Sequence, residues 1–252
     1  MGAMEVFRYE RKYLVTERTA AAIRRFVACY LVHDEHMKGQ ESEGYRVCSL
    51  YLDTPHLGLY NQTMQGIKNR YKLRIRYYDE FKYSPAFLEI KKRTTDTVHK
   101  LRAVVSKAVA AKLLSGGQIE HADLLANGDA SHRALEEFSR CCERLSAVGV
   151  AFVDYQREAF VSQSAESVRV TFDRRIVGHR YYPGCGLETP IEHSLPVTRG
   201  VLLELKYNGR APRWMHDVVT TFNLQRMAFA KYVHCVDALK IDLNYTGKLI
   251  RR

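Results

Sequence analysis

Four short stretches of the chain alternate apolar and charged positions. The clearest is residues 72–77, with the sequence KLRIRY, and the same alternation recurs in residues 87–93, 168–173 and 203–207. Because alternate side chains of a strand point to opposite faces, the charges of each stretch share one face. One such strand is typical of any sheet with a solvated face. Four strands in which cations dominate predict a sheet whose polar face contacts something anionic.

The remaining pattern predicts further strands at residues 6–15, 45–53 and 151–161. Apolar residues at helical spacing, with capping and stop signals, predict helices between them. These helices are expected after Thr16, from Thr54-Pro55 to about Tyr60, over 104–114, from Ser131 to Gly149, from Pro212, and over 225–239. Residues 178–200 contain several Gly and Pro and are predicted to be irregular.

Strands joined by hairpins or by inserted helices favour a mainly antiparallel α+β domain. No repeat or low-complexity linker divides the chain. We therefore expect one domain over residues 5–242, with residues 1–4 a cloning remnant or disordered and 243–252 a basic tail.

The chain is basic, with 39 Lys and Arg against 28 Asp and Glu and a formal net charge of +11. Such a balance attracts anions, which include nucleic acid, anionic membranes and phosphorylated small molecules, and charge alone does not choose among them. The six cysteines form no C-x-x-C pair, so they indicate buried thiols and not a zinc site. No segment reads as a membrane span or secretory signal. We expect a cytoplasmic protein.

The charged face has two interpretations. In an open sheet it is a solvated surface or a platform for nucleic acid, whereas in a closed barrel it lines a wet tunnel that binds a polyanion. Arg suits this because its planar fork contacts two phosphate oxygens at once. The side chains expected on this face are Arg8, Glu10, Lys12, Lys72, Arg74, Arg76, Glu89, Lys91, Arg93, Arg157, Arg169, Glu204 and Lys206.

The carboxylates of this face either neutralise cations or hold a divalent metal that itself holds phosphate. Glu204 and Glu10 are the best candidates. For Glu204 we favour a metal ligand over an ion pair, and for Glu10 both readings stay open. Histidines and acids in residues 33–36 do not favour a metal site, because nothing in that polar loop fixes its geometry. Walker, G-x-G-x-x-G, H-E-x-x-H and G-x-S-x-G motifs are absent from the sequence.

At these residues the sequence resembles the VTC domain, the polyphosphate polymerase-like branch of the triphosphate tunnel metalloenzymes, which also include the CYTH proteins. Each motif alone is weak, but together they follow the order of the family and cover nearly the whole chain. The motifs are residues 8–13, 49–54, 72–76, 88–93, 155–160, 168–173, 203–207 and 230–232.

The resemblance implies an eight-stranded antiparallel β-barrel tunnel with helices packed outside. It implies that basic side chains in the tunnel bind a nucleotide triphosphate and a growing polyphosphate. The implied catalytic cations are Arg74, Arg76, Arg157 and Arg169. The implied substrate-binding cations are Lys12, Lys91, Lys206 and Lys231, and from the charged face itself we also expect Arg8, Lys72 and Arg93 to bind substrate. Glu204, with Glu10, would hold Mn or Mg.

One position departs from the wider superfamily, whose first strand reads E-x-E-x-K. Here Arg8 replaces the first Glu. The loss of one carboxylate weakens the case for a two-metal hydrolase and favours a single-metal phosphotransferase.

The resulting hypothesis is transfer of the ATP γ-phosphoryl group to inorganic polyphosphate, with ATP and polyphosphate as partners and no DNA. The first alternative is a triphosphatase of the same fold, in which water is the acceptor. The second is a non-catalytic module that binds polyphosphate or RNA. The preferred metal, chain length, oligomeric state and any membrane partner that takes up the product stay open.

Overall fold

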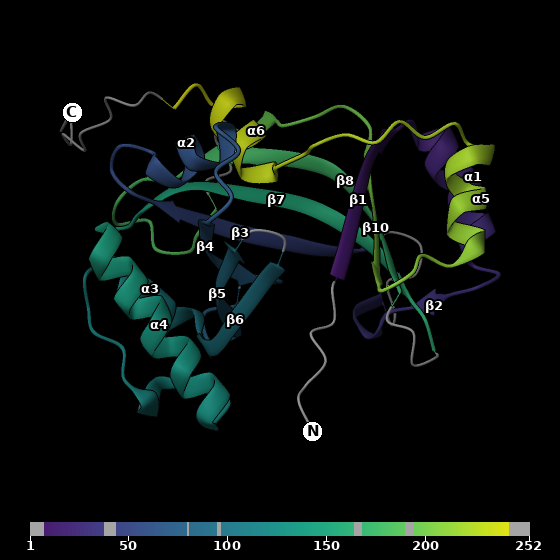
Figure 1. The fold of residues 1–252 in the computed structure, drawn as a ribbon. Helices are drawn as coiled ribbons and strands as arrows, with labels where there is room; N and C mark the ends of the chain where they lie inside the picture. The colour runs from purple at the N-terminus through teal and green to yellow at the C-terminus, as the bar shows by residue number, and fades with distance from the viewer. Residues whose placement is uncertain are drawn as a thin grey trace. The chain divides into compact units, whose positions relative to one another are not determined.

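The computed structural model describes residues 8–37, 44–79, 81–94, 97–163, 168–189 and 194–241. The predicted terminal segments, residues 1–4 and 243–252, lie outside these ranges. The described residues form a mixed α+β fold with six helices and a large antiparallel sheet (Figure 1). The α+β class predicted from the sequence is thereby confirmed.

The main path of paired strands runs β1-β10-β8-β7-β3-β4-β5-β6, while β2 pairs with β7 and β9 with β8. Within the described residues the end strands β1 and β6 are not paired with each other, so the expected barrel is not confirmed. The strands are β1 (Arg8–Val15), β2 (Val32–His33), β3 (Tyr45–Asp53), β4 (Arg70–Tyr77), β5 (Pro85–Thr94), β6 (Thr97–Ser106), β7 (Val148–Val161), β8 (Arg169–Arg180), β9 (Leu195–Pro196) and β10 (Val201–Asn208).

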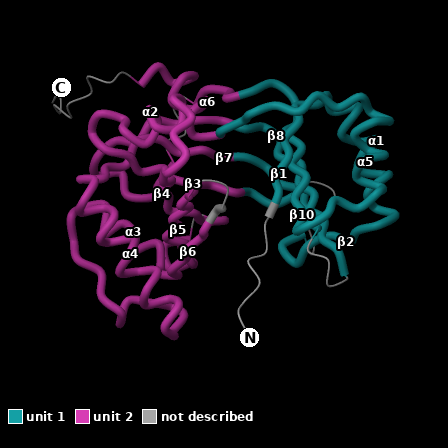
Figure 2. Tube along the Cα trace, viewed as in Figure 1, with its two compact units in different colours: residues 1–46, 155–176, 198–230 teal, residues 47–154, 177–197, 231–252 magenta. Residues whose placement is uncertain are grey.

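The chain divides into two compact units, drawn in teal and magenta in Figure 2. Unit 1 contains residues 1–46, 155–176 and 198–230, and unit 2 contains residues 47–154, 177–197 and 231–252. Each unit has its own apolar core.

In unit 1, helices α1 (Glu17–Val27) and α5 (Arg213–Thr221) pack on one face of β1 and β10 (Figure 1). Thr16 caps α1 as predicted, because its side chain accepts a hydrogen bond from the Thr19 N–H. Ile23 and Val218 bring the two helices into the core and are fully buried. The opposite face of the strands is left for the charged side chains.

In unit 2, helices α3 (Lys107–Leu114) and α4 (Asp129–Leu145) cover β5 and β6, and α2 (Gly58–Met64) lies near α6 (Lys231–Ala238) (Figure 1). On β4, Leu73, Ile75 and Tyr77 are fully buried, as the alternation predicts.

The predicted helix over residues 104–114 is wrong in its first part, since β6 runs to Ser106 and α3 begins at Lys107. Ala103 and Val105 alternate with exposed or partly exposed neighbours and are both buried against the core, which is strand and not helix periodicity. Ser106 then caps α3 by accepting from the Val109 N–H.

The predicted helix start at Thr54-Pro55 is also wrong, because α2 begins at Gly58. The cause is Asp53, a fully buried carboxylate that accepts from the N–H groups of Leu59 and Tyr60 at 2.7 and 2.9 Å. Thr54 is not the N-cap, which is Leu57 in the left-handed conformation, but its side chain accepts from the Gly58 N–H at 2.7 Å.

Other boundaries also differ from the prediction. Helix α4 begins at Asp129, before Ser131, and ends at Leu145, before Gly149, which lies in β7. Strand β8 continues past Gly178 to Arg180. Gly178 is needed within β8 because a Cβ atom there would lie 2.5 Å from Cys235 Sγ. Helix α6 begins only at Lys231, because Met227 instead donates its N–H to the carbonyl of Lys12 in β1.

We predict that Asp53→Ala lowers the free energy of unfolding by about 3 kcal/mol, because it leaves several buried donors without an acceptor. Those donors include the Tyr232 hydroxyl, at 2.7 Å from Asp53. Urea unfolding measures the change. Asp237→Ala is the matched control, since it removes an exposed acceptor of the Tyr60 hydroxyl. Equal effects of the two substitutions would contradict the role given to Asp53.

Candidate functional site

Strand register brings the charged residues of unit 1 together. Lys12 on β1 lies opposite Glu204 on β10, and Glu204 lies opposite Thr171 on β8. Two residues along, Lys206 pairs with Arg169 across β10 and β8. We call the resulting group the Glu204 cluster. It consists of Glu10, Lys12, Arg157, Asp173, Glu204 and Lys206.

Glu204 is the centre of this cluster and is almost fully buried. Its Oε2 atom lies 2.5 Å from Lys206 Nζ and 3.7 Å from Arg157 Nη2, while its Oε1 atom lies 3.7 Å from Lys12 Nζ. Burial lowers the pKa of Lys206, although Glu204 and Glu10 oppose that shift. One carboxylate therefore contacts three cations.

Arg157 is held by a second carboxylate. Its Nε and Nη2 atoms donate to the two oxygens of Asp173, each at 2.7 Å. Burial alone would lower the pKa of Arg157, but the adjacent Asp173 raises it well above its ordinary value. The guanidinium thus stays charged inside the protein, in a fixed orientation.

Arg169 is anchored away from Glu204, by a residue of the loop after β2. Its Nη2 atom donates to Asp34 Oδ2 at 2.5 Å and to the Tyr45 hydroxyl at 3.2 Å. In turn the Tyr45 hydroxyl donates to Asp34 at 3.3 Å. Asp34 lies in the polar loop over residues 33–36, for which the sequence does not favour a metal site, and in the structure it holds an arginine.

The corresponding group in unit 2 is built around Glu89 of β5, and we call it the Glu89 cluster. Glu89 has no exposed surface. Its Oε2 atom accepts from Arg74 Nε at 2.7 Å, and its Oε1 atom contacts Lys100 at 2.7 Å and Arg102 at 2.6 Å. Arg74 on β4 lies directly opposite Glu89, and Arg102 on β6 lies opposite it on the other side.

These cations determine the charge state of Glu89. Burial alone would raise the pKa of its carboxyl, but Arg74, Arg76 and Lys100 hold it well below its usual range. Burial lowers the pKa of Lys100 to about 8, even though Glu89 attracts its proton. The negative charge of Glu89 is also in contact with the guanidiniums of Arg74 and Arg102.

Two hydroxyl groups of β3 complete the environment of the β4 arginines. Arg74 Nη1 donates to the Tyr51 hydroxyl at 3.2 Å, and Arg76 Nε donates to Ser49 Oγ at 3.2 Å. Burial alone would raise the pKa of Tyr51, yet Arg74, Lys72 and Arg76 lower it. The ring of Tyr51 stacks on Tyr232 of α6, with centroids 4.9 Å apart.

The other predicted site residues are placed less specifically. Lys72 and Lys91 are register partners on β4 and β5 and are partly buried, whereas Arg93 is exposed near the end of β5. Lys231 begins α6 and is partly buried. The backbone of Arg8 pairs with Asn208, and its side chain lies outside what the structure describes.

The carboxylates proposed as metal ligands are both close to the same ammonium group. Lys12 Nζ lies 3.1 Å from Glu10 and 3.7 Å from Glu204, and it donates to the Phe229 carbonyl at 2.7 Å. Among the described residues, no group of three or more His, Cys, Asp and Glu side chains is arranged to hold a metal. The two carboxylates are hard oxygen donors that suit Mg²⁺ or Mn²⁺, provided that other ligands complete the coordination.

The sequence of the chain matches a known domain family. A model described as "VTC domain" matches residues 7–240. The chain belongs to the VTC domain family. This confirms the resemblance read from the ordered motifs, which extend over the same part of the chain.

Two solved structures are similar to this VTC domain. One is a candidate adenylate cyclase from Vibrio parahaemolyticus, with 14% identity over 92% of this chain and 98% of that chain and a TM-score of 0.45. The other is the PH1819 protein from Pyrococcus horikoshii, with 11% identity over 91% and 98% and a TM-score of 0.46. A search of curated proteins found no match. No helix in the described part of the chain is long and apolar enough to cross a membrane.

We predict that Lys100 loses its proton near pH 8, as its lowered pKa indicates. Because the unfolded chain keeps this proton to a higher pH, stability rises with pH between about 8 and the ordinary lysine value near 10.4. Titration of ¹³C-methylated lysines by NMR, with Lys100→Arg to assign the signal, measures the pKa. Glu89→Gln removes the attraction that opposes the shift, so it lowers this pKa further, and an unchanged value in that variant would contradict the arrangement.

Proposed function

We propose that this VTC domain is a metal-dependent polyphosphate polymerase, which transfers the γ-phosphoryl group of ATP to a growing chain of inorganic polyphosphate and releases ADP. Membership of the family supports the reaction class. The observation that carries the proposal is that the site carboxylates hold arginines in place and are ion-paired themselves.

The arginines serve to align phosphoryl groups and to neutralise their charge. Phosphoryl transfer asks a protein mainly for these two contributions, and not for a covalent nucleophile. Arg74, Arg157 and Arg169 each have a carboxylate that fixes the guanidinium before substrate arrives. Arg76 is oriented by Ser49. In this proposal their N–H groups donate to the equatorial oxygens of the phosphoryl groups.

The lysines have a different role, because an ammonium on a flexible stem contacts phosphate without directional demands. Lys12 and Lys206 belong to the Glu204 cluster, and Lys72 and Lys91 lie side by side across β4 and β5. In this proposal these four, with Arg8, Arg93 and Lys231, bind the polyphosphate chain.

The ion pairs also favour phosphate over water as the acceptor. Water must lose a proton when it attacks, so a hydrolase benefits from a carboxylate that can act as a base. Glu89, Asp173 and Glu204 each contact at least one cation within 2.7 Å, and the pKa of Glu89 is strongly lowered. Glu89 is therefore a weak base, and the other two carboxylates already contact cations. A terminal phosphate oxygen is already anionic and needs no base.

Glu204 and Glu10 are the residues proposed to hold Mn²⁺ or Mg²⁺, in competition with the Lys12 ammonium that they both contact. A divalent ion held there would supply neutralisation of the negative charge on the phosphates of the substrate. The residues of the chain keep the task of orienting the substrate.

The test is incubation of the protein with ATP and Mn²⁺ or Mg²⁺, followed by separation of the products on a gel. We expect long polyphosphate chains, and at least a 100-fold loss of rate in Arg74→Ala and in Glu204→Ala, because each removes transition-state stabilisation of a size typical for a charged group. Release of orthophosphate alone would establish the triphosphatase instead.

Two surface variants control for non-specific effects. Arg25→Ala and Glu143→Ala remove the same charges from exposed positions of α1 and α4 and should leave the rate unchanged. If the unmodified protein does not turn over ATP and Glu204→Ala still binds polyphosphate, the protein is a non-catalytic binding module and not a polymerase.

A further inference from the structure

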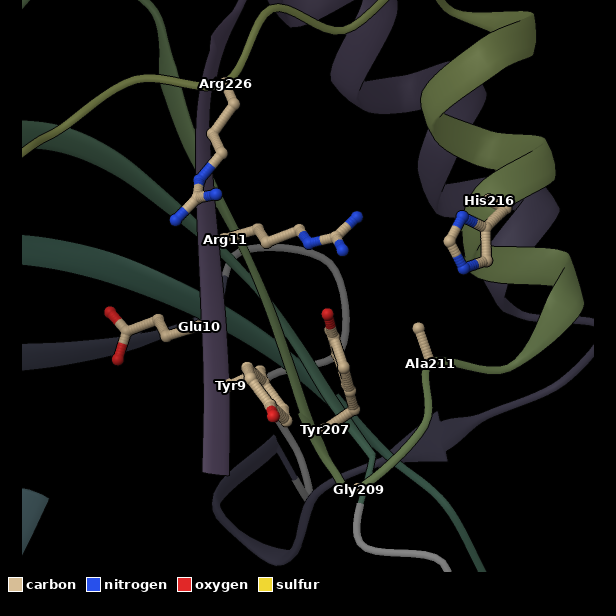
Figure 3. A pocket seen from close by; sticks show the side chains of 8 residues that line it. All are labelled: Tyr9, Glu10, Arg11, Tyr207, Gly209, Ala211, His216 and Arg226. Atoms are coloured by element: carbon tan, nitrogen blue, oxygen red, sulfur yellow. The ribbon is translucent and has the colours of Figure 1, made fainter. Parts of the chain in front are cut away.

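A cavity of about 420 Å³ lies in unit 1 and shares only Glu10 with the Glu204 cluster (Figure 3). Arg11 extends from β1 toward α5 and His216 points back toward it, while Glu10 projects away on the opposite side of the strand. The lining residues are Tyr9, Glu10, Arg11, Tyr207, Gly209, Ala211, His216 and Arg226.

Arg11 is a charged residue on an otherwise apolar face. Strand alternation puts it on the same face as Tyr9 and Tyr13, opposite to Glu10 and Lys12. Its register partner is the fully buried Leu205 of β10. A guanidinium on a face that is covered by helices elsewhere calls for an explanation other than core packing.

Arg226 supplies a second guanidinium to the same cavity, and the backbone fixes its position. It forms a β-bridge with Tyr13, and the next residue, Met227, donates its N–H to the Lys12 carbonyl at 2.9 Å. His216 of α5 adds a ring nitrogen. Within the described residues, no carboxylate forms an ion pair with Arg11, Arg226 or His216.

A glycine and two tyrosines form much of the remaining wall of the cavity. Gly209 adopts φ +64°, a conformation that favours glycine, and a Cβ atom there would meet nothing within 4 Å. Tyr207 is buried, its ring centroid lies 5.6 Å from the Arg11 guanidinium carbon, and it stacks on the half-exposed Tyr9. The cavity thus combines two cations and an aromatic wall.

We infer that this cavity is a second anion site, which binds a small phosphate-bearing molecule on the helix-covered side of β1. Two guanidiniums without carboxylate partners present their N–H groups to phosphate oxygens, with which arginine forms bidentate hydrogen bonds. The ring of Tyr9 is available to a flat group attached to the phosphate. The inference does not depend on the proposed reaction.

The test is titration of the whole protein with pyrophosphate and, separately, with AMP, followed through the His216 ring signals by NMR. His216→Gln assigns the signals. We expect at least one ligand to shift them, and the double variant Arg11→Gln/Arg226→Gln to weaken that binding at least 10-fold. Tighter binding of pyrophosphate identifies an inorganic phosphate ligand, and tighter binding of AMP identifies a nucleotide.

Arg210→Gln/Arg213→Gln is the matched control, since it removes the same charge from two exposed arginines that do not line the cavity. It should leave the affinity within about twofold. Ala211→Phe fills the cavity without changing charge and should also abolish the His216 shift. The inference is overturned if neither ligand shifts the His216 signals. It is also overturned if the two double variants weaken ligand binding by the same factor.

Discussion

The structure depends on the pairing of buried carboxylates with arginines on the polar face of the sheet. Glu89 and Asp173 have no exposed surface, and each lies in hydrogen-bond contact with an arginine of a neighbouring strand. A buried guanidinium without such a partner would cost several kcal/mol, since desolvation of the charge would not be offset. Without these carboxylates, the arginines of these strands would have to lie on a fully hydrated surface.

The same pairing connects fold to function. A carboxylate that holds one side of a guanidinium fixes the direction in which its other N–H groups point, which is the preorganisation that phosphoryl transfer uses. Glu204 differs because it contacts two lysines as well as Arg157. One of these lysines, Lys12, also contacts Glu10. Glu204 is accordingly the carboxylate that we assign to a metal, whereas Asp173 and Glu89 are assigned to arginines.

Strand alternation was sufficient to predict the charged face, since its period of two separates Arg74 from Leu73 without any tertiary information. Register was not predictable, and it decides that Glu89 lies between Arg74 and Arg102 and that Glu204 lies beside Lys12. Asp34 could not be connected with Arg169 from the sequence, because 135 positions separate them. The start of α2 was mispredicted for a local reason: Asp53, directly before the predicted cap Thr54, accepts from the N–H groups of Leu59 and Tyr60.

The most direct test of this account is the affinity of Asp173→Asn for tripolyphosphate, measured by calorimetry. The substitution makes the site more positive by one charge, so attraction between net charges alone would strengthen binding. If Asp173 acts by orienting Arg157, the affinity instead falls at least fivefold, because the guanidinium loses its bidentate anchor. Equal or tighter binding by the folded variant would contradict the claim that buried carboxylates position the phosphate-binding arginines.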